Sequence, residues 1–265
     1  MLNFSISNLA WNTEQNETVY SLMQRYDFQG LEIAPTKIIP DAPYLHITEA
    51  TEWAKVVKTK YGFCVPSIQS IWYGRPEKLF GTEEERNELF KYTKSAIDFA
   101  SAIKCKNLVF GCPKNRNISA EANFAVCNRI AVDFFKQLGD YAALKNTCIG
   151  MEANPSIYGT NFVNTTTEAI ALIEQVNSTG FKLNLDIGTM IQNDEVLSVL
   201  QGKDKFINHV HISEPFLKKI EKRNLHKEVI SLLRAKKYNG FVSIEIGLQE
   251  KIDDIEDVLQ YIRNI

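Results

Sequence analysis

Short apolar runs alternate with longer amphipathic stretches along the whole chain. Eight of the apolar runs have the length and the β-branched or aromatic content of buried strands: 3–7, 30–33, 63–68, 107–110, 148–152, 181–186, 206–211 and 241–246. Four stretches between them show clear helical periodicity: 82–103, 120–144, 166–176 and 224–235. Thr82 with Glu85 has the spacing of a capping box at a helix start, and Gly62 and Gly180 stand where C-terminal caps are expected.

The alternation of strands and helices predicts a parallel sheet in which every crossover is a helix. The 265 residues divided over eight units give about 33 residues each, which suits one strand and one helix per unit. An open doubly wound sheet fits the alternation less well, because the first strand runs into SNLAWN without a glycine-rich turn. No linker or low-complexity stretch divides the chain. The prediction is therefore an α/β protein, with one TIM barrel, a (β/α)8 fold, as a single domain over residues 1–265.

Composition and charge exclude several classes of protein. The net charge is −2 and the basic residues are dispersed, which argues against a nucleic-acid partner. No apolar run approaches the roughly 20 residues of a membrane span, and the N-terminus lacks the pattern of a secretory signal, so we expect a cytoplasmic protein without a membrane partner. The five cysteines form no C-x-x-C pair and are expected to be free thiols.

Polar residues end four consecutive predicted strands, in the segments CIGMEANP, KLNLDIGT, NHVHISEP and VSIEIG. Because side chains alternate in a strand, an inward-facing Glu152 turns Met151 toward the helices, and the same test holds for the other three strands. The four inward residues at the carboxyl ends are Glu152, Asp186, His211 and Glu245. This end of a barrel carries the chemistry in barrel enzymes.

Three carboxylates and one imidazole repel each other strongly in a small buried space unless a cation joins them. We therefore expect one divalent metal ion, with Mn²⁺, Mg²⁺ or Co²⁺ favoured by the oxygen-rich ligands and Zn²⁺ also compatible. A single acid at a strand end is more often a cap or an ion-pair partner; four with matching parity favour the metal site. His209 lies one layer below His211, where it either orients a ligand or fills the barrel.

The same segments resemble the sugar phosphate isomerase/epimerase family of xylose isomerase-like barrels. The resemblance covers nearly the whole chain and includes SNLAW, GLEIAPTK, QSIWYGRPEKLFGTEEER, VFGCPKNR, MEANPSIYGTNF and HVHISEP. It implies that Glu152, Asp186, His211 and Glu245 are the metal ligands. It also implies that Glu152 and Glu245 are the catalytic acid/base pair, one on each face of a bound sugar.

The resemblance and the chemistry together predict a metal-dependent isomerase or epimerase of a small sugar or sugar phosphate, which transfers a proton through a metal-stabilised enediolate. Two alternatives stay open. One is a dehydratase of a keto-polyol or dehydroshikimate-type substrate, a lyase that begins with the same proton abstraction. The other is a non-catalytic barrel that binds a sugar or a partner protein.

Some positions depart from the family pattern. Many relatives carry a histidine three residues after the strand-six aspartate, where this chain has Thr189. Histidines are also missing from the loops after strands three and four, which disfavours the endonuclease branch with its several zinc ions. Relatives often form dimers or tetramers, so a homo-oligomer is compatible with the resemblance.

Four further residues are candidates for substrate binding. Arg116 in PKNR has the planar guanidinium that binds an anion through two hydrogen bonds. Asn154 is placed to bind a sugar hydroxyl, and Glu32 and His209 have inward parity on their strands. His226, in a helical pattern, is expected at the surface.

Overall fold

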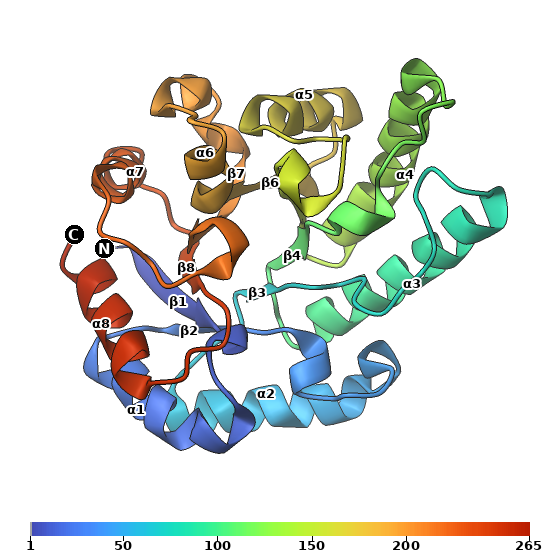
Figure 1. The fold of residues 1–265 in the computed structure, drawn as a ribbon. Helices are drawn as coiled ribbons and strands as arrows, with labels where there is room; N and C mark the ends of the chain where they lie inside the picture. Colours follow the sequence, from blue (N-terminus) through green and yellow to red (C-terminus); the bar gives the residue numbers. More distant parts are fainter. Residues whose placement is uncertain (1) are drawn as a thin grey trace.

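The computed structural model describes residues 2–265. In these residues, eight strands alternate with eight α-helices (Figure 1). The strands are β1 (Asn3–Ser7), β2 (Gly30–Glu32), β3 (Ser67–Ile68), β4 (Asn107–Phe110), β5 (Ile149–Met151), β6 (Phe181–Asp186), β7 (Ile207–Ser213) and β8 (Phe241–Glu245). The helices are α1 (Asn16–Arg25), α2 (Ile47–Tyr61), α3 (Glu83–Ala102), α4 (Phe124–Leu144), α5 (Thr166–Val176), α6 (Ile187–Gln192), α7 (Asn224–Ala235) and α8 (Ile252–Arg263).

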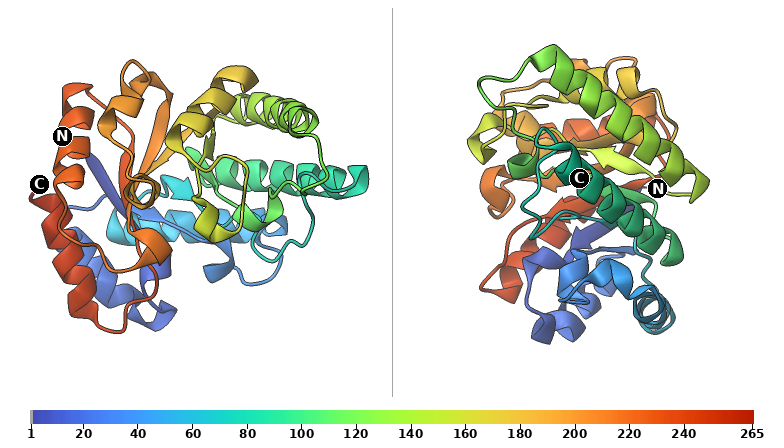
Figure 2. Two further views of the ribbon diagram at one scale, coloured as in Figure 1. Left: turned by 45° about the horizontal axis from the view of Figure 1, so that its top comes forward. Right: turned by 90° about the vertical axis from the view of Figure 1, so that its right-hand side faces the viewer.

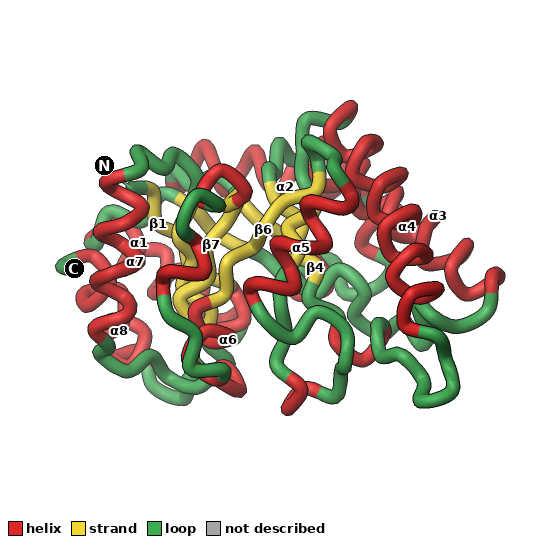
Figure 3. The backbone as a smooth tube through the Cα atoms, turned by 90° about the horizontal axis from the view of Figure 1, so that it is seen from above, coloured by secondary structure: helices red, strands yellow, loops and turns green. Residues whose placement is uncertain are grey.

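The strands form one parallel sheet in the order β2-β1-β8-β7-β6-β5-β4-β3. Its two end strands meet through isolated bridges that join Gly30 to Cys64 and Ile33 to Ile68, so the barrel is nearly closed. The helices surround the strands in Figure 1, and Figure 3 shows the longer loops gathered at one end of the strands. The predicted (β/α)8 barrel is confirmed.

The third strand is the one that differs most from its predicted bounds. The apolar run 63–68 predicts six residues, but regular pairing is limited to Ser67 and Ile68. Pro66 supplies the reason, because it has no backbone N–H to donate to a neighbouring strand. Only its carbonyl is used, as the acceptor for Lys106 N at 3.2 Å.

The helix ends follow the local sequence signals with one exception. Thr82 and Glu85 form the predicted capping box of α3, and Gly62 closes α2 with a φ of +83°. Gly180 is not the cap of α5. Asn177 takes that left-handed position at a φ of +47°, and Gly180 is needed for another reason. A Cβ at Gly180 would lie 2.1 Å from the carbonyl oxygen of Gly139 on α4, so glycine allows the close approach of β6 to that helix.

The barrel has an apolar outer layer and a polar interior. Side chains such as Met151 and Leu185 are buried against the helices, as the parity of their strands predicts. The interior contains small hydrogen-bonded polar groups: Gln69 Nε2 donates to Ser7 Oγ at 2.6 Å, and Asn107 Nδ2 donates to Ser67 Oγ at 2.9 Å. These pairs satisfy polar groups that would otherwise destabilise the core.

Aromatic packing fixes the middle strands to the long helices. α3 and α4 lie side by side along one flank of the barrel (Figure 2). The ring of Phe135 on α4 stacks on Phe181 of β6 at 4.8 Å and meets Phe110 of β4 edge-on at 4.7 Å. All three are buried, and burying each such side chain stabilises a fold by about 1.5–3 kcal/mol. These contacts pack β6, the strand that ends in Asp186, against α4.

Two further predictions concern single features of the chain. All five cysteines are free, and Cys105, Cys127 and Cys148 are buried, as expected for thiols in an apolar environment. His226 was expected at the surface, but on α7 it is completely buried.

Within residues 2–265, no helix has both the length and the apolar character needed to cross a membrane.

Candidate metal centre

The four residues at the strand ends meet in space. Glu152 directly follows β5, Asp186 and Glu245 are the last residues of β6 and β8, and His211 lies near the end of β7. One ligand atom from each lies within 4.8 Å of the others. We call these four residues the outer cluster. Their convergence is what the parity of the strands predicts.

His211 is the centre of the outer cluster. Its Nδ1 lies 3.0 Å from Glu152 Oε1 and 3.1 Å from Glu245 Oε2, while its Nε2 lies 3.0 Å from Glu32 Oε1. A carboxylate can only accept, so Nε2 carries a hydrogen toward Glu32. By the same rule, Nδ1 carries a hydrogen toward Glu152 and Glu245 in the charged ring, and loss of that hydrogen would direct the Nδ1 lone pair into the outer cluster, which is the orientation that a metal-binding imidazole needs.

Asp186 is held by the residues around the start of α6. Its Oδ2 accepts from Thr189 N at 2.8 Å and lies 2.7 Å from Thr189 Oγ1, and its Oδ1 accepts from the hydroxyl of Ser213. Asp186 is therefore also the N-cap of α6. Thr189, which replaces the histidine of many relatives, is buried against Asp186 and does not reach the mouth of the barrel.

The outer cluster has a surplus of negative charge. Burial, together with the charges of Glu152 and Asp186, raises the pKa of Glu245 to about 7, although His211 acts in the opposite direction. Burial and Glu152 also raise the pKa of Asp186. Burial alone would lower the pKa of His211, but Glu32 and Glu245 raise it well above its usual value. A divalent cation would remove this surplus, and three carboxylates with one imidazole are suitable ligands for it.

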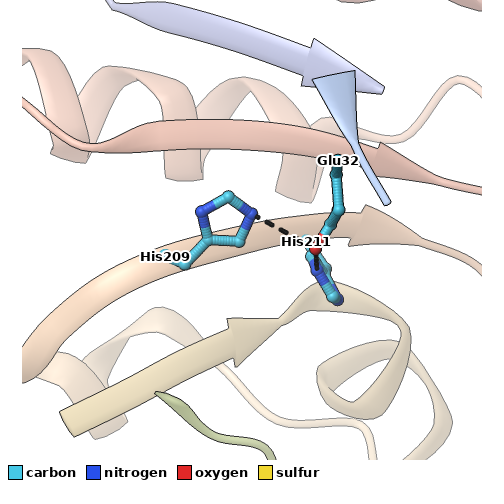
Figure 4. Close-up of side chains that lie close together, drawn as sticks. All are labelled: Glu32, His209 and His211. Atoms are coloured by element: carbon cyan, nitrogen blue, oxygen red, sulfur yellow. Dashed lines mark hydrogen bonds and ion pairs between the residues drawn. The ribbon is translucent and has the colours of Figure 1, made fainter. Parts of the chain in front are cut away.

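Glu32, His209 and His211 form a second group, which we call the inner cluster. Figure 4 shows the carboxylate of Glu32 between the two rings, with both histidines on the same strand. His209 Nε2 lies 3.7 Å from Glu32 Oε1. Burial would raise the pKa of Glu32, but the two imidazoles hold it well below its usual value. One carboxylate between two imidazoles needs no additional cation.

The inner cluster does not fit the predicted role of substrate binding. The side chains of Glu32 and His209 are 0% and 1% exposed, so no atom of either is available to a ligand in the mouth of the barrel. Their placement instead makes Glu32 the partner that orients His211. In the outer cluster, Glu152 and Glu245 are 11% and 13% exposed, and they face the opening.

The chain was then compared with known proteins. A family model described as a xylose isomerase-like TIM barrel matches residues 21–265. The chain belongs to this family. A comparison with curated protein sequences gave no match.

Solved structures of this xylose isomerase-like fold resemble the chain over almost its full length. A 3-keto-D-glucoside 4-epimerase from E. coli is 18% identical with a TM-score of 0.80, and each chain covers 100% of the other. A D-psicose 3-epimerase from Clostridium cellulolyticum H10 is 14% identical with a TM-score of 0.76, over 99% of this chain and 92% of that one. A family 2 AP endonuclease from Brucella melitensis is 17% identical with a TM-score of 0.74, covering 94% and 95%.

Arg116 occupies a different place from the one expected for an anion-binding residue of this xylose isomerase-like barrel. Its side chain is completely buried behind Glu152 and Asn154. Protein atoms enclose the whole guanidinium, so even Nε, which has no hydrogen-bond partner within the described residues, is out of reach of a substrate anion, and the expected substrate contact does not fit this structure. Asn154 is 8% exposed at the edge of the outer cluster, and its role in substrate binding stays a prediction.

Sequence reasoning missed one residue that holds the site. Asn184 Nδ2 donates to Glu152 Oε1 at 2.8 Å and lies 3.3 Å from His211 Nδ1. The signal was present, because Asn184 precedes Asp186 by two residues on β6 and therefore shares its inward parity.

Proposed function

We propose that the protein is a metal-dependent isomerase or epimerase of a small sugar. The observation that carries this proposal is the geometry of the outer cluster, in which the imidazole of His211 lies deep while the three carboxylates around it are partly accessible. Two accessible carboxylates on β5 and β8 approach one point from different strands, with β6 and β7 between them. This arrangement suits proton transfer on either face of a small substrate.

The chemistry requires removal of a weakly acidic C–H proton beside a carbonyl group. A bound divalent cation would supply the positive charge that stabilises the resulting anion. One of the two glutamates takes the proton, and the same or the other glutamate returns it. Return to the same carbon on the opposite face inverts that centre, whereas return to the neighbouring carbon moves the carbonyl.

The contacts of the two glutamates support their proposed role in proton transfer. Both oxygens of Glu152 have a hydrogen-bond donor, from Asn184 and from Asn154 Nδ2 at 3.1 Å, so the carboxylate is held in one orientation. Glu245 contacts His211. The names of two structural neighbours, a 3-keto-D-glucoside 4-epimerase and a D-psicose 3-epimerase, describe reactions of this class.

The test is proton exchange with solvent. The protein is loaded with Mn²⁺ and incubated in D₂O with D-psicose, D-tagatose, D-fructose and D-fructose 6-phosphate, and NMR follows deuterium at the carbons next to the carbonyl. We expect incorporation into at least one sugar, with an isomer or epimer as the product, and loss of both in Glu245→Gln. Incorporation at the wild-type rate in both Glu152→Gln and Glu245→Gln would overturn the assignment of the acid/base pair.

The same experiment separates the alternatives. A dehydratase shares the first proton transfer but expels a β-hydroxyl group, and its product absorbs in the ultraviolet as a conjugated enone. A barrel that only binds a sugar shows sugar binding by calorimetry but no deuterium exchange with any metal ion.

A further inference from the structure

Arg116 is an unusual buried cation. It follows the short turn Pro113–Asn115 after β4, and its side chain is fully enclosed. Burial lowers the pKa of its guanidinium to about 10. Its hydrogen-bond acceptors are all neutral: Nη1 donates to the carbonyl of Glu152 at 3.0 Å, and Nη2 donates to Asn154 Oδ1 at 2.9 Å and to the carbonyl of Val163 at 3.3 Å. Burying a guanidinium costs free energy, so its placement here calls for a reason.

The reason follows from the amide of Asn154. A guanidinium only donates, so the oxygen of this amide must face Arg116 and its NH₂ group must face the other way. On that side Asn154 Nδ2 donates to Glu152 Oε2 at 3.1 Å. Rotating the amide by 180° would place N–H against N–H and oxygen against carboxylate. Arg116 therefore determines which end of Asn154 meets Glu152.

The other oxygen of Glu152 is also held by an amide whose orientation is determined by a neighbouring donor. Asn107 Nδ2 donates to Asn184 Oδ1 at 3.3 Å, and this contact leaves Asn184 Nδ2 to donate to Glu152 Oε1 at 2.8 Å. Gly111 also leaves room for this carboxylate, because a Cβ at that position would lie 2.8 Å from Glu152 Oε2. Two side-chain amides thus hold the carboxylate of Glu152, and each amide is oriented by a hydrogen bond from another residue.

We propose that Arg116 is a positioning residue for Glu152, which acts through the amide of Asn154 and is not a contact for a substrate anion. It anchors the main chain of Glu152 directly and its side chain through Asn154. The consequence for function rests on the proposed role of Glu152 as a metal ligand and proton carrier. Loss of Arg116 leaves the chemistry of Glu152 intact but releases its orientation.

A double-mutant cycle tests the connection. Arg116→Met, Asn154→Ala and the double variant are compared for Mn²⁺ affinity and for the rate of deuterium exchange. We expect each single variant to lower both quantities by roughly 10–100-fold, the usual cost of losing a partner that orients a ligand, and we expect the KM for sugar to stay nearly unchanged in Arg116→Met. In the Asn154→Ala background, Arg116→Met should cost little more. Effects that multiply would overturn the proposal, because Arg116 would then act independently of Asn154.

Two variants guard against simple misfolding. Asn154→Asp keeps an oxygen toward Arg116 but replaces the donor toward Glu152 with an acceptor, so it should slow exchange by a similar factor while the fold is retained. Wild-type exchange in this variant would contradict the proposal. Arg75→Met is the matched control, since Arg75 is a half-buried arginine of the neighbouring loop that pairs with Glu77. It should leave Mn²⁺ affinity and exchange unchanged.

A third readout is independent of metal and activity. The side-chain NH₂ group of Asn154 should give two resolved ¹⁵N-correlated NMR signals that exchange slowly with water, and Arg116→Met should make that exchange faster. Unchanged Asn154 signals in Arg116→Met would refute the positioning role. If Mn²⁺ does not bind and no sugar exchanges, the proposed function fails, while these signals still decide the role of Arg116.

Discussion

The outer and inner clusters share His211 but differ in charge and in access. The outer cluster combines three carboxylates with one imidazole, and its carboxylates are partly accessible. The inner cluster places one carboxylate between two imidazoles in an enclosed space. The first arrangement has a surplus of negative charge that a cation would remove, while the second is balanced by its own residues.

The difference shows how one strand can serve two purposes. His209 and His211 are two residues apart on β7, so both point inward but at different depths. Glu32 of β2 lies between them and determines which nitrogen of His211 carries the hydrogen. The inner cluster therefore contributes to the outer cluster by orienting its imidazole.

The largest effect is expected from neutralising a carboxylate of the outer cluster. Glu245→Gln removes a candidate metal ligand, so Mn²⁺ affinity should fall by more than the roughly 10–100-fold that the loss of an orienting partner costs. The stability of the metal-free protein should change in the opposite direction. Because burial and the neighbouring carboxylates raise the pKa of Glu245, its ionised form destabilises the fold at neutral and higher pH.

The measurement is urea unfolding in the presence of EDTA, with calorimetry for Mn²⁺. We expect the free energy of unfolding of Glu245→Gln at pH 8 to increase by on the order of 1–3 kcal/mol. Glu250→Gln is the control, since Glu250 is an exposed glutamate in the loop after β8. A variant that is less stable without metal and still binds Mn²⁺ normally would remove the distinction between the two clusters.

The inner cluster should respond in the reverse sense. Glu32→Gln removes the buried countercharge of His211, and breaking a buried ion pair in this way typically costs about 3–5 kcal/mol. Mn²⁺ affinity should fall by roughly 10–100-fold, because His211 loses the partner that orients it. Chemical denaturation and calorimetry measure the two effects. Normal stability together with normal Mn²⁺ affinity would show that Glu32 only packs in the barrel interior and does not orient His211.

The sequence was sufficient to predict those parts of the molecule in which apolar and polar residues repeat with the period of a strand or a helix. Alternation along β5 to β8 relates residue number to face, so the convergence of the outer cluster could be predicted from four strand ends. The same rule finds Asn184. His226 was misplaced although a signal existed, since the buried residues of α7 are His226, Val229, Ile230 and Leu233, which have helical spacing.

The residues that a period does not govern could not be placed. Arg116 and Asn154 lie in loops, and their contact joins the loop after β4 to the loop after β5 across 38 residues. Nothing in PKNR distinguishes a guanidinium that faces solvent from one that turns inward. The requirement at Gly180 is also a tertiary one, because the clash that excludes a side chain comes from the backbone of another helix. Such contacts depend on how distant segments pack.

His226 offers a third buried imidazole for comparison, since no carboxylate within residues 2–265 forms an ion pair with it. Burial lowers its pKa to about 4. The unfolded chain binds a proton near pH 6.5, so between about pH 6.5 and 4 the unfolded state holds more protons at this position. Stability should therefore fall as the pH decreases through this window, by up to about 3 kcal/mol from this residue.

The test compares the free energy of unfolding against pH for the wild type and His226→Gln. The variant should be less stable at pH 7, because a partly buried hydrogen bond to Tyr261 is altered, but its loss of stability toward pH 4.5 should be smaller. Parallel pH profiles for the two proteins would mean that His226 does not titrate differently in the folded state. His46→Gln, at an exposed histidine, serves as the control variant.

The smallest effect is expected at Thr189, which separates the orientation of a ligand from its charge. Thr189→Val keeps the shape and the backbone N–H that bonds Asp186 at 2.8 Å, but it removes the hydroxyl that lies 2.7 Å from the same oxygen. One lost hydrogen bond costs about 0.5–1.5 kcal/mol, so Mn²⁺ affinity should fall by only a few-fold. Thr189→Ser, which restores the hydroxyl, should recover it. A loss as large as that of Asp186→Asn would mean that the hydroxyl itself reaches the cation, and the outer cluster would then contain a fifth ligand.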